Sequence, residues 1–355
     1  MPLQLPSYMG TSGNASSALA APKGNYGDIE NTGFEISLNT HPITGKFEWD
    51  SDFQISFNKN KLKGLAGTAN AQIVGYGQWT DVVSVSSVGE SLYNFYGFVC
   101  DGVYKDLEDL QTSPKPAKYP ANGVFDRTNT VWVGDVKYKD ISGPDGVPDG
   151  VIDDYDKTNI GSPMPKFTFG WTNTFRYKNF DLSVFINGSY GNKVYNYLSM
   201  KLTHMNSPWT NQLNAVNGRA ELVPINPNKV YEDGAMWYND VSNVMVANPG
   251  DSIARATIND PNDTDRISDR YIEDRSYIRL TTISLGSTFP KKTIDQLGLS
   301  NLRIYANIQN LLTITGYDGY DPEIGASTSS VNVYGLDNGR YPSPTVYSFG
   351  LNVSF

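Results

Sequence analysis

The last stretch of the chain, "TVYSFGLNVSF" at residues 345–355, alternates between apolar and small or polar side chains. Successive side chains of a β-strand point to opposite faces, so a period of two separates the two sets. One face carries the apolar set Tyr347, Phe349, Leu351, Val353 and Phe355. Chain ends usually fray because they make few contacts. A terminus that stays patterned up to an aromatic residue predicts either a sheet edge or an end that is itself recognised.

The same alternation recurs upstream and predicts about seven strands in all. In residues 46–58, for example, Phe53 and Ile55 alternate with Gln54 and Ser56. The other predicted strands are residues 33–41, 166–177, 180–190, 276–289 and 301–314. The pattern of residues 276–289 is ragged, which indicates a β-bulge.

The connections between these strands alternate between short and long. Residues 42–45, 178–179 and 290–300 are short, and the last of them has room for a helical turn. Residues 59–165, 191–275 and 315–344 are long. In an antiparallel sheet this order places all the long connections at one end, which is typical of outer-membrane barrels with short periplasmic turns and extended external loops.

The sequence therefore predicts an all-β fold, an antiparallel transmembrane β-barrel segment with long extracellular loops. A soluble sandwich or propeller also alternates polar with apolar residues and is the alternative. Loops much longer than about 15 residues are uncommon in soluble domains unless they have a function. The two longest connections are rich in Gly, Pro, Asn, Tyr and Trp, so we expect folded surface structure there.

Composition excludes several classes of protein. No apolar run approaches the roughly 18 residues of a membrane-spanning helix, so a membrane crossing would have to use strands. The formal net charge of −9 argues against a nucleic-acid partner, which needs a basic face. The single cysteine, Cys100, allows no disulfide within the chain. The only histidines, His41 and His204, lie far apart, which argues against a histidine-based active site and against an enzyme.

The first residues, "PLQLPSYMGTSGNASS" after Met1, have neither a basic start nor an apolar core nor a cleavage pattern. They do not form a signal peptide. Because an exported protein needs one, we expect the signal sequence of this protein to lie upstream of these residues.

Several ordered segments resemble one known family. They include "FEWDSDFQISFNKNKL" at 47–62, "SPMPKFTFGWTNTFRYKNFDLSVFINGSYGNKVYN" at 162–196, "LSNLRIYANIQNLLTITGYDGYDPEIG" at 299–325 and "GLDNGRYPSPTVYSFGLNVSF" at 335–355. From about residue 26 onward the chain resembles the C-terminal third of the SusC/RagA-like TonB-linked (TonB-dependent) outer-membrane transporters of Bacteroidota.

The resemblance implies a plugged barrel of roughly 22 strands. Residues 1–355 would then be the C-terminal portion of the barrel, with 59–165 and 191–275 as external excursions and the plug elsewhere. The implied function is TonB-dependent uptake of oligosaccharides or peptides at the cell outer membrane.

The implied partners are a SusD-like surface lipoprotein, TonB through the missing N-terminal part, outer-membrane lipid and the barrel-assembly machinery. The machinery would read the patterned C-terminal strand. A passive barrel or surface-binding protein without energy coupling stays open, and a secreted hydrolase is a further alternative that lacks a catalytic constellation.

An acidic stretch, "DGVPDGVIDDYD" at residues 145–156, follows the outline of a twelve-residue calcium loop. Hard cations need several oxygens on a sharply bent loop, and Gly150 stands at the turning position. The candidate ligands are Asp145, Asp149, Asp153 and Asp156. Val147 offers no side-chain oxygen at the third position, so a solvated acidic turn is the alternative. Calcium is the only cofactor that the sequence suggests.

Aromatic residues of the long connections are candidates for ligand contact. An aromatic face suits the apolar C–H patches of a sugar ring. The candidates are Trp79, Trp132, Trp209 and Trp237, with Tyr334 as a further external aromatic residue. Packing of the loops against each other or against a partner is the alternative.

Overall fold

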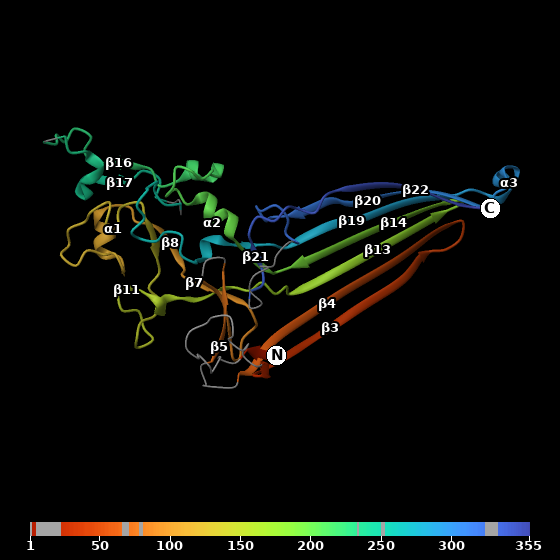
Figure 1. The fold of residues 1–355 in the computed structure, drawn as a ribbon, viewed down its shortest axis with the longest axis horizontal. Coiled ribbons are helices and arrows are strands. Elements are labelled where there is room, and N and C mark those ends of the chain that lie inside the picture. The colour runs from red at the N-terminus through yellow and green to blue at the C-terminus, as the bar shows by residue number, and fades with distance from the viewer. Residues whose placement is uncertain are drawn as a thin grey trace, which may run out of the picture.

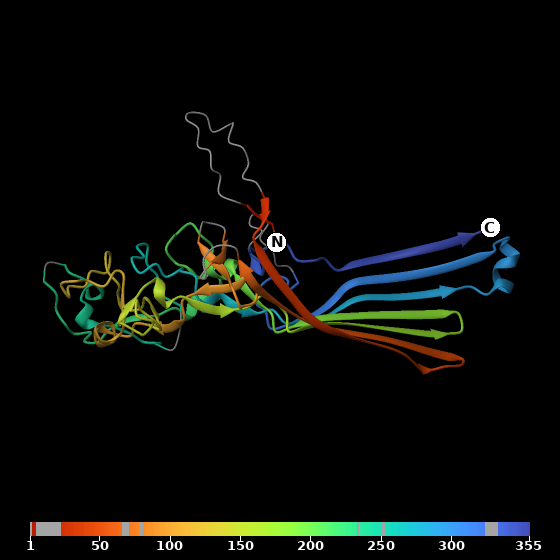
Figure 2. The ribbon, with the colours of Figure 1, turned by 90° about the horizontal axis from the view of Figure 1, so that it is seen from below.

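The computed structural model describes residues 2–4, 23–65, 71–77, 81–232, 234–249, 253–323 and 333–355. A long sheet extends as a single layer from a folded region built by the connections, which we call the loop body (Figures 1 and 2). Among the described residues, no helix is both long enough and apolar enough to cross a membrane.

The long sheet has seven strands in the order β22-β20-β19-β14-β13-β4-β3, and every neighbouring pair is antiparallel. Their bounds are β3 (Gly27–Ile43), β4 (Phe47–Leu65), β13 (Phe167–Tyr177), β14 (Phe180–Tyr190), β19 (Tyr277–Thr288), β20 (Asn301–Thr315) and β22 (Val346–Ser354). The predicted all-β barrel segment with about seven strands is confirmed. The first two strands run several residues further than predicted, because β3 and β4 keep pairing as far as Gly27 and Leu65.

The ragged alternation of the fifth strand does mark a bulge. Pairing of β19 with β20 shifts between Leu280 and Thr282, so that Thr281 stands opposite two residues of β20. One of those two, Asn310, has φ 53°, a left-handed conformation that asparagine tolerates better than most residues. The bulge keeps the apolar side chains on one face on both sides of the irregularity.

The short connections lie at the end of the sheet far from the loop body, together with the C-terminus (Figure 1). The turn between β13 and β14 is Lys178-Asn179, with Lys178 at φ 55°. Between β19 and β20, the predicted helical turn is present as α3 (Lys291–Ile294) followed by η6 (Asp295–Leu297).

The loop body consists of small sheets and short helices. Its strands are β5 (Gln72–Tyr76), β6 (Val82–Ser87), β7 (Asn94–Gly97), β8 (Cys100–Val103), β9 (Lys115–Pro116), β10 (Val136–Tyr138), β11 (Val151–Ile152), β12 (Thr158–Gly161), β15 (Lys193–Asn196), β16 (Leu222–Pro224), β17 (Val244–Val246), β18 (Ile272–Asp274) and β21 (Leu336–Asp337). Its helices are α1 (Leu107–Thr112), α2 (Tyr197–Thr203), η1 (Asp154–Asp156), η2 (Asn214–Gly218), η3 (Trp237–Asn239), η4 (Val241–Asn243) and η5 (Asp269–Tyr271). A separate pair, β1 (Pro2–Gln4) and β2 (Lys23–Asn25), lies near the N-terminus.

The loop body has its own hydrophobic interior. One cluster gathers around Phe95, Tyr195 and Tyr271, and a second around Trp132 and Val244. The first cluster combines residues from all three long connections and the second from two of them, and Phe98 forms a parallel bridge with Ser268. The connections are therefore one packed structure and not separate loops.

Candidate functional site

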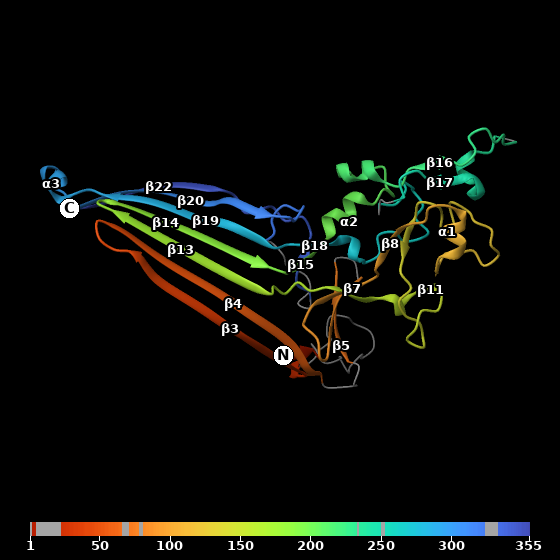
Figure 3. The ribbon, with the colours of Figure 1, turned by 180° about the vertical axis from the view of Figure 1, so that it is seen from behind.

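The two faces of the long sheet differ in chemistry. Cross-strand partners lie on the same face, so the register assigns one face to apolar side chains on all seven strands. This apolar face includes Phe34, Ile36, Leu38, Phe53, Ile55, Phe57, Phe169, Trp171, Leu182, Val184, Ile186, Ile283, Leu285, Ile308, Tyr347 and Phe349. Figure 3 shows the same single layer from behind, and the side of a transmembrane barrel that meets lipid has this composition.

Polar atoms on the apolar face are paired with one another. The indole nitrogen of Trp49 donates to Asn173 Oδ1 over 2.9 Å, and that of Trp171 donates to Ser51 Oγ over 2.9 Å. An unpaired polar group in hydrocarbon costs several kcal/mol. The two tryptophans therefore allow Ser51 and Asn173 to lie on a lipid-facing surface.

The opposite, polar face carries ion pairs near the short turns. Arg176 Nη1 lies 2.5 Å from Asp50 Oδ2, and His41 Nδ1 lies 2.5 Å from Asp50 Oδ1. Further along the sheet, Arg303 of β20 reaches across β19 and binds both oxygens of Asp181 of β14, over 2.6 and 2.7 Å. A charged wall of this kind fits the interior of a barrel and not its lipid side.

A further arginine fixes the connection between β20 and β22 to the polar face. Arg279 on β19 is buried and binds Glu323 over 2.5 Å and Asp321. Asp321 also accepts the backbone N–H groups of Glu323 and Ser343. Burial raises the pKa of Asp321, but these bonds and Arg279 outweigh it and lower the pKa below its usual value. The carboxylate is therefore ionised and holds the connection in place.

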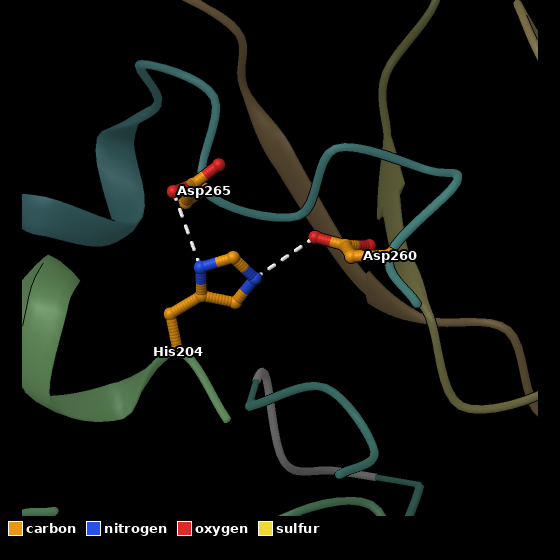
Figure 4. Close-up of side chains that lie close together, drawn as sticks. All are labelled: His204, Asp260 and Asp265. Atoms are coloured by element: carbon orange, nitrogen blue, oxygen red, sulfur yellow. Dashed lines mark hydrogen bonds and ion pairs between the residues drawn. The ribbon is translucent and has the colours of Figure 1, made fainter. Parts of the chain in front are cut away.

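In the loop body, His204 lies between two carboxylates (Figure 4). Its Nε2 is 2.9 Å from Asp260 and its Nδ1 is 3.1 Å from Asp265. Burial lowers the pKa of His204, but the two hydrogen bonds raise it more, to about 9. In the described residues these three side chains form the one group whose potential metal-binding atoms lie within 4.8 Å of one another. Because both ring nitrogens already contact carboxylates, the imidazolium takes the place that a cation would occupy.

We expect His204 to make the stability of the loop body depend on pH. Its folded pKa of about 9 lies above the usual 6.5, so the added stability is complete below about pH 6.5 and is lost as pH rises through about 9. Between about pH 7 and pH 10 the loss should be roughly 2 kcal/mol. Hydrogen exchange of the amides of α2 and residues 260–271 in the full-length protein measures it. A His204→Gln variant should lack this pH dependence, and an unchanged slope in that variant would contradict the assignment.

The acidic stretch 145–156 folds into a turn braced by its own backbone. Asp156 is fully buried, and its Oδ1 accepts the N–H of Ile141 over 2.7 Å. Its Oδ2 accepts the N–H of Asp153 over 2.9 Å, and Asp153 Oδ1 accepts that of Tyr155. Asp149 Oδ1 accepts the N–H of Val151, and Asp145 is exposed. Calcium binding stays a prediction, and it would require Asp156 to exchange backbone bonds for the ion.

No three of the four predicted carboxylates are among the described groups that lie within metal-binding distance of one another. The capping arrangement of Asp153 and Asp156 around η1 accounts for this, because each carboxylate turns toward backbone N–H groups and not toward a shared centre.

The candidate tryptophans lie in different environments. Trp132 is fully buried in the core of the loop body, so it is not external as predicted. Trp237 is partly buried against the same core and contacts Tyr238 edge-on. Trp209 is 92% exposed, and Trp79 lies outside the described residues. Tyr334 contacts Tyr93 and the guanidinium of Arg275. Only Trp209 among the described candidates presents a free ring.

A groove of about 720 Å³ opens beside Trp209, lined by the neighbouring residues Pro208 and Thr210. Arg127, Arg219 and Ile258 also line it. Neither arginine forms an ion pair with an acidic residue in the part of the chain that the structure describes. Arg127 lies over the Tyr238 ring and Arg219 donates to the carbonyl of Val216, so both keep a positive charge with no carboxylate partner, which suits a ligand that carries an anionic group.

No family model matches the chain. Two curated TonB-dependent receptors of Formosa agariphila are 30% and 33% identical to it over 362 and 342 residues, covering 100% and 93% of the chain. The TonB-dependent receptor SusC of Bacteroides thetaiotaomicron is 26% identical over 335 residues and covers 93% of the chain. The chain belongs to the TonB-dependent receptor family.

The chain spans about a third of the length of the curated receptors that it matches, between 27% and 31% of each. Solved structures agree on the fold of this receptor region. The RagAB peptide transporter superposes with a TM-score of 0.66 at 17% identity, covering 100% of the chain and 32% of the solved one. The RagAB peptide importer in its closed-closed state covers 96% of the chain with a TM-score of 0.62.

The last strand of this receptor region is an edge of the sheet. β22 pairs with β20 on one side and with no other described strand, and Phe355 is 93% exposed. Tyr347, Phe349, Leu351 and Val353 lie on the apolar face. An open edge is removed when a barrel closes. Recognition of this strand by an assembly machinery stays a prediction, and the exposed aromatic row is available for it.

Proposed function

We propose that the complete protein imports nutrients across the outer membrane, driven by TonB and assisted by a SusD-like lipoprotein on its external side. The observation that carries the proposal is the sequence similarity of 93% of the chain to SusC, together with the fold that the chain shares with the RagAB transporter. The apolar face of the sheet supports a place in the membrane, and the loop body supplies a folded surface at one end.

Oligosaccharides or peptides are the proposed cargo. The groove beside Trp209 favours a ligand with apolar and anionic parts, since Pro208 and Ile258 offer apolar surface and Arg127 and Arg219 offer positive charge. A peptide carboxylate and an acidic sugar would both satisfy these groups. Growth of a strain that lacks the gene, on a panel of glycans and peptides, identifies the cargo.

Energy coupling is tested in the same strain. Import should be restored by the full-length gene and not by a version without the segment that contacts TonB. Equal restoration by both versions would favour a passive barrel and overturn the proposal of active uptake.

We expect the lipoprotein to dock on the exposed apolar groups around the groove. Replacing Trp209 and Ile258 by serine removes two side chains that are 92% and 76% exposed, so the protein should still fold. Burial of such side chains contributes about 1.5–3 kcal/mol each, and the double variant should retain at least tenfold less co-purified lipoprotein. Leu297→Ser, at the short-turn end, is the matched control. Equal retention in both variants would refute docking at this place.

A further inference from the structure

A second groove lies at the end of the apolar face nearest the loop body. Its volume is about 580 Å³, and it opens where β4 continues beyond the last residue that pairs with β13. Pairing of these strands ends at Ser56 and Thr168, and the chain before β13 then diverges from β4. The groove lies in the fork between the two strands, and Phe34, Phe57 and Lys59 of the apolar face line part of it.

Aromatic rings form the floor of the groove and continue beyond it. Phe34 and Phe57 stack with their centroids 4.6 Å apart, and Phe57 and Phe167 follow at 5.6 Å. Tyr190 continues the row at 5.2 Å from Phe167. The row crosses β3, β4, β13 and β14 at one level, as an aromatic girdle of a membrane barrel does.

Both walls of the groove are fixed by hydrogen bonds. On one side, Asn60 Oδ1 accepts from Ser91 Oγ and from the N–H of Leu92, both over 2.8 Å. On the other side, the N–H of Lys166 donates to the carbonyl of Tyr190 over 2.8 Å. These hydrogen bonds hold the backbone on both sides of the groove in place.

Two lysines line the groove. Lys59 is on the apolar face, two residues beyond Phe57, and Lys166 directly precedes Phe167. Both side chains are exposed, and neither forms an ion pair with a described acidic residue. Met164 and Pro165 add apolar surface between them. Unpaired positive charge next to an apolar, lipid-facing floor is complementary to an anionic amphiphile.

We propose that this groove binds a phosphate-bearing lipid of the outer leaflet, with its phosphate on Lys59 and Lys166 and its acyl chains on the aromatic row. The inference depends on the membrane position of the sheet and not on import. It assigns a lipid site to the rim between the barrel wall and the loop body. A lipid held there would brace the fork between β4 and β13.

The full-length receptor, purified in a non-ionic detergent and delipidated, tests the proposal. After bis-phosphorylated lipid A is added back, native mass spectrometry should detect it bound to the receptor. Each lysine near an anionic headgroup contributes about fivefold in affinity, so Lys59→Gln with Lys166→Gln should weaken binding about 25-fold. Lys178→Gln, at the opposite end of the same sheet, is the matched control and should bind as the unaltered protein does. Loss of import in a separate assay leaves this measurement unaffected, because it uses neither TonB nor cargo.

Three results would overturn the proposal. Equal binding by the double variant and the Lys178 control would show that the lysines do not hold the phosphate. Equal binding of a lipid with the same chains and no phosphate would show adsorption to the apolar face alone. Complete displacement of the lipid by inorganic phosphate at about 10 mM would assign the site to a free anion.

Discussion

Replacing Arg255 by methionine should destabilise the loop body by roughly 3–5 kcal/mol. Arg255 Nε lies 2.7 Å from Asp135 Oδ1, and the two side chains are 2% and 1% exposed. Removing one partner of a buried ion pair leaves the other charge without compensation in a low-dielectric interior. Asp135 also accepts the backbone N–H of Trp132. The loss of stability should therefore extend into the core around the Trp132 ring.

The charge origin of this effect gives it a pH dependence. Burial raises the pKa of Asp135 to about 6, although Arg255 lowers it. Without Arg255 the pKa rises further, so the native state of the variant binds a proton more readily than that of the unaltered protein. The destabilisation should therefore be largest well above neutral pH, shrink as pH falls toward about 6 because the variant protonates Asp135 first, and stay constant below about 6, where both proteins hold the proton. Hydrogen exchange of the β10 and β17 amides in the full-length receptor measures it.

Two control variants separate the buried pair from an ordinary surface charge. Lys229→Met breaks the exposed pair with Asp240 and should change the stability of the loop body far less than Arg255→Met does. Asp135→Asn added to Arg255→Met removes the stranded charge and should recover most of the loss. If the double variant is as unstable as Arg255→Met alone, packing and not charge explains the effect.

A lysine at Val184 should cost roughly 2–4 kcal/mol in a lipid bilayer. Val184 lies midway along β14 on the apolar face, with Asn173 and Ile283 as its cross-strand neighbours. A Lys facing lipid at the bilayer midplane of a β-barrel costs this amount, and the cost falls to about 0–1 kcal/mol near the interfaces. Guanidinium unfolding of the full-length receptor from phospholipid vesicles gives the value.

The adjacent residue supplies the control, because alternation turns it to the other face. Ser183 has Thr174 and Ser284 as cross-strand neighbours on the polar face. Ser183→Lys should change the free energy of unfolding by less than about 1 kcal/mol. Similar costs at both positions would mean that the two faces of β14 meet the same environment, and the apolar face would then not be a lipid surface.

The sheet could be predicted from the sequence because its signal is local. Alternation with a period of two is visible within ten residues, and the seven predicted strands agree with β3, β4, β13, β14, β19, β20 and β22 to within a few residues except at the outer ends of β3 and β4. Even the bulge at Thr281 was visible, as a break in the alternation.

The interior of the loop body could not be predicted, because its contacts join distant residues. Arg255 and Asp135 are 120 positions apart, and His204 is 56 positions from Asp260. No local pattern links such partners. Trp132 looked external because it lies in a long connection, although the abundance of aromatic residues there already indicated a core. The raised pKa of His204 could not be predicted from the sequence, because the two carboxylates that stabilise its protonated form come close to it only in the fold.

The bridge between Phe98 and Ser268 has a consequence for the order of events during biogenesis. The two residues belong to different connections, one running from residue 66 to 166 and the other from 191 to 276. Neither connection can complete its interior alone, so both must be translocated before either is finished. The loop body can therefore become rigid only after β13 and β14, which lie between the two connections in the chain, have been made and both connections have reached the same side of the sheet.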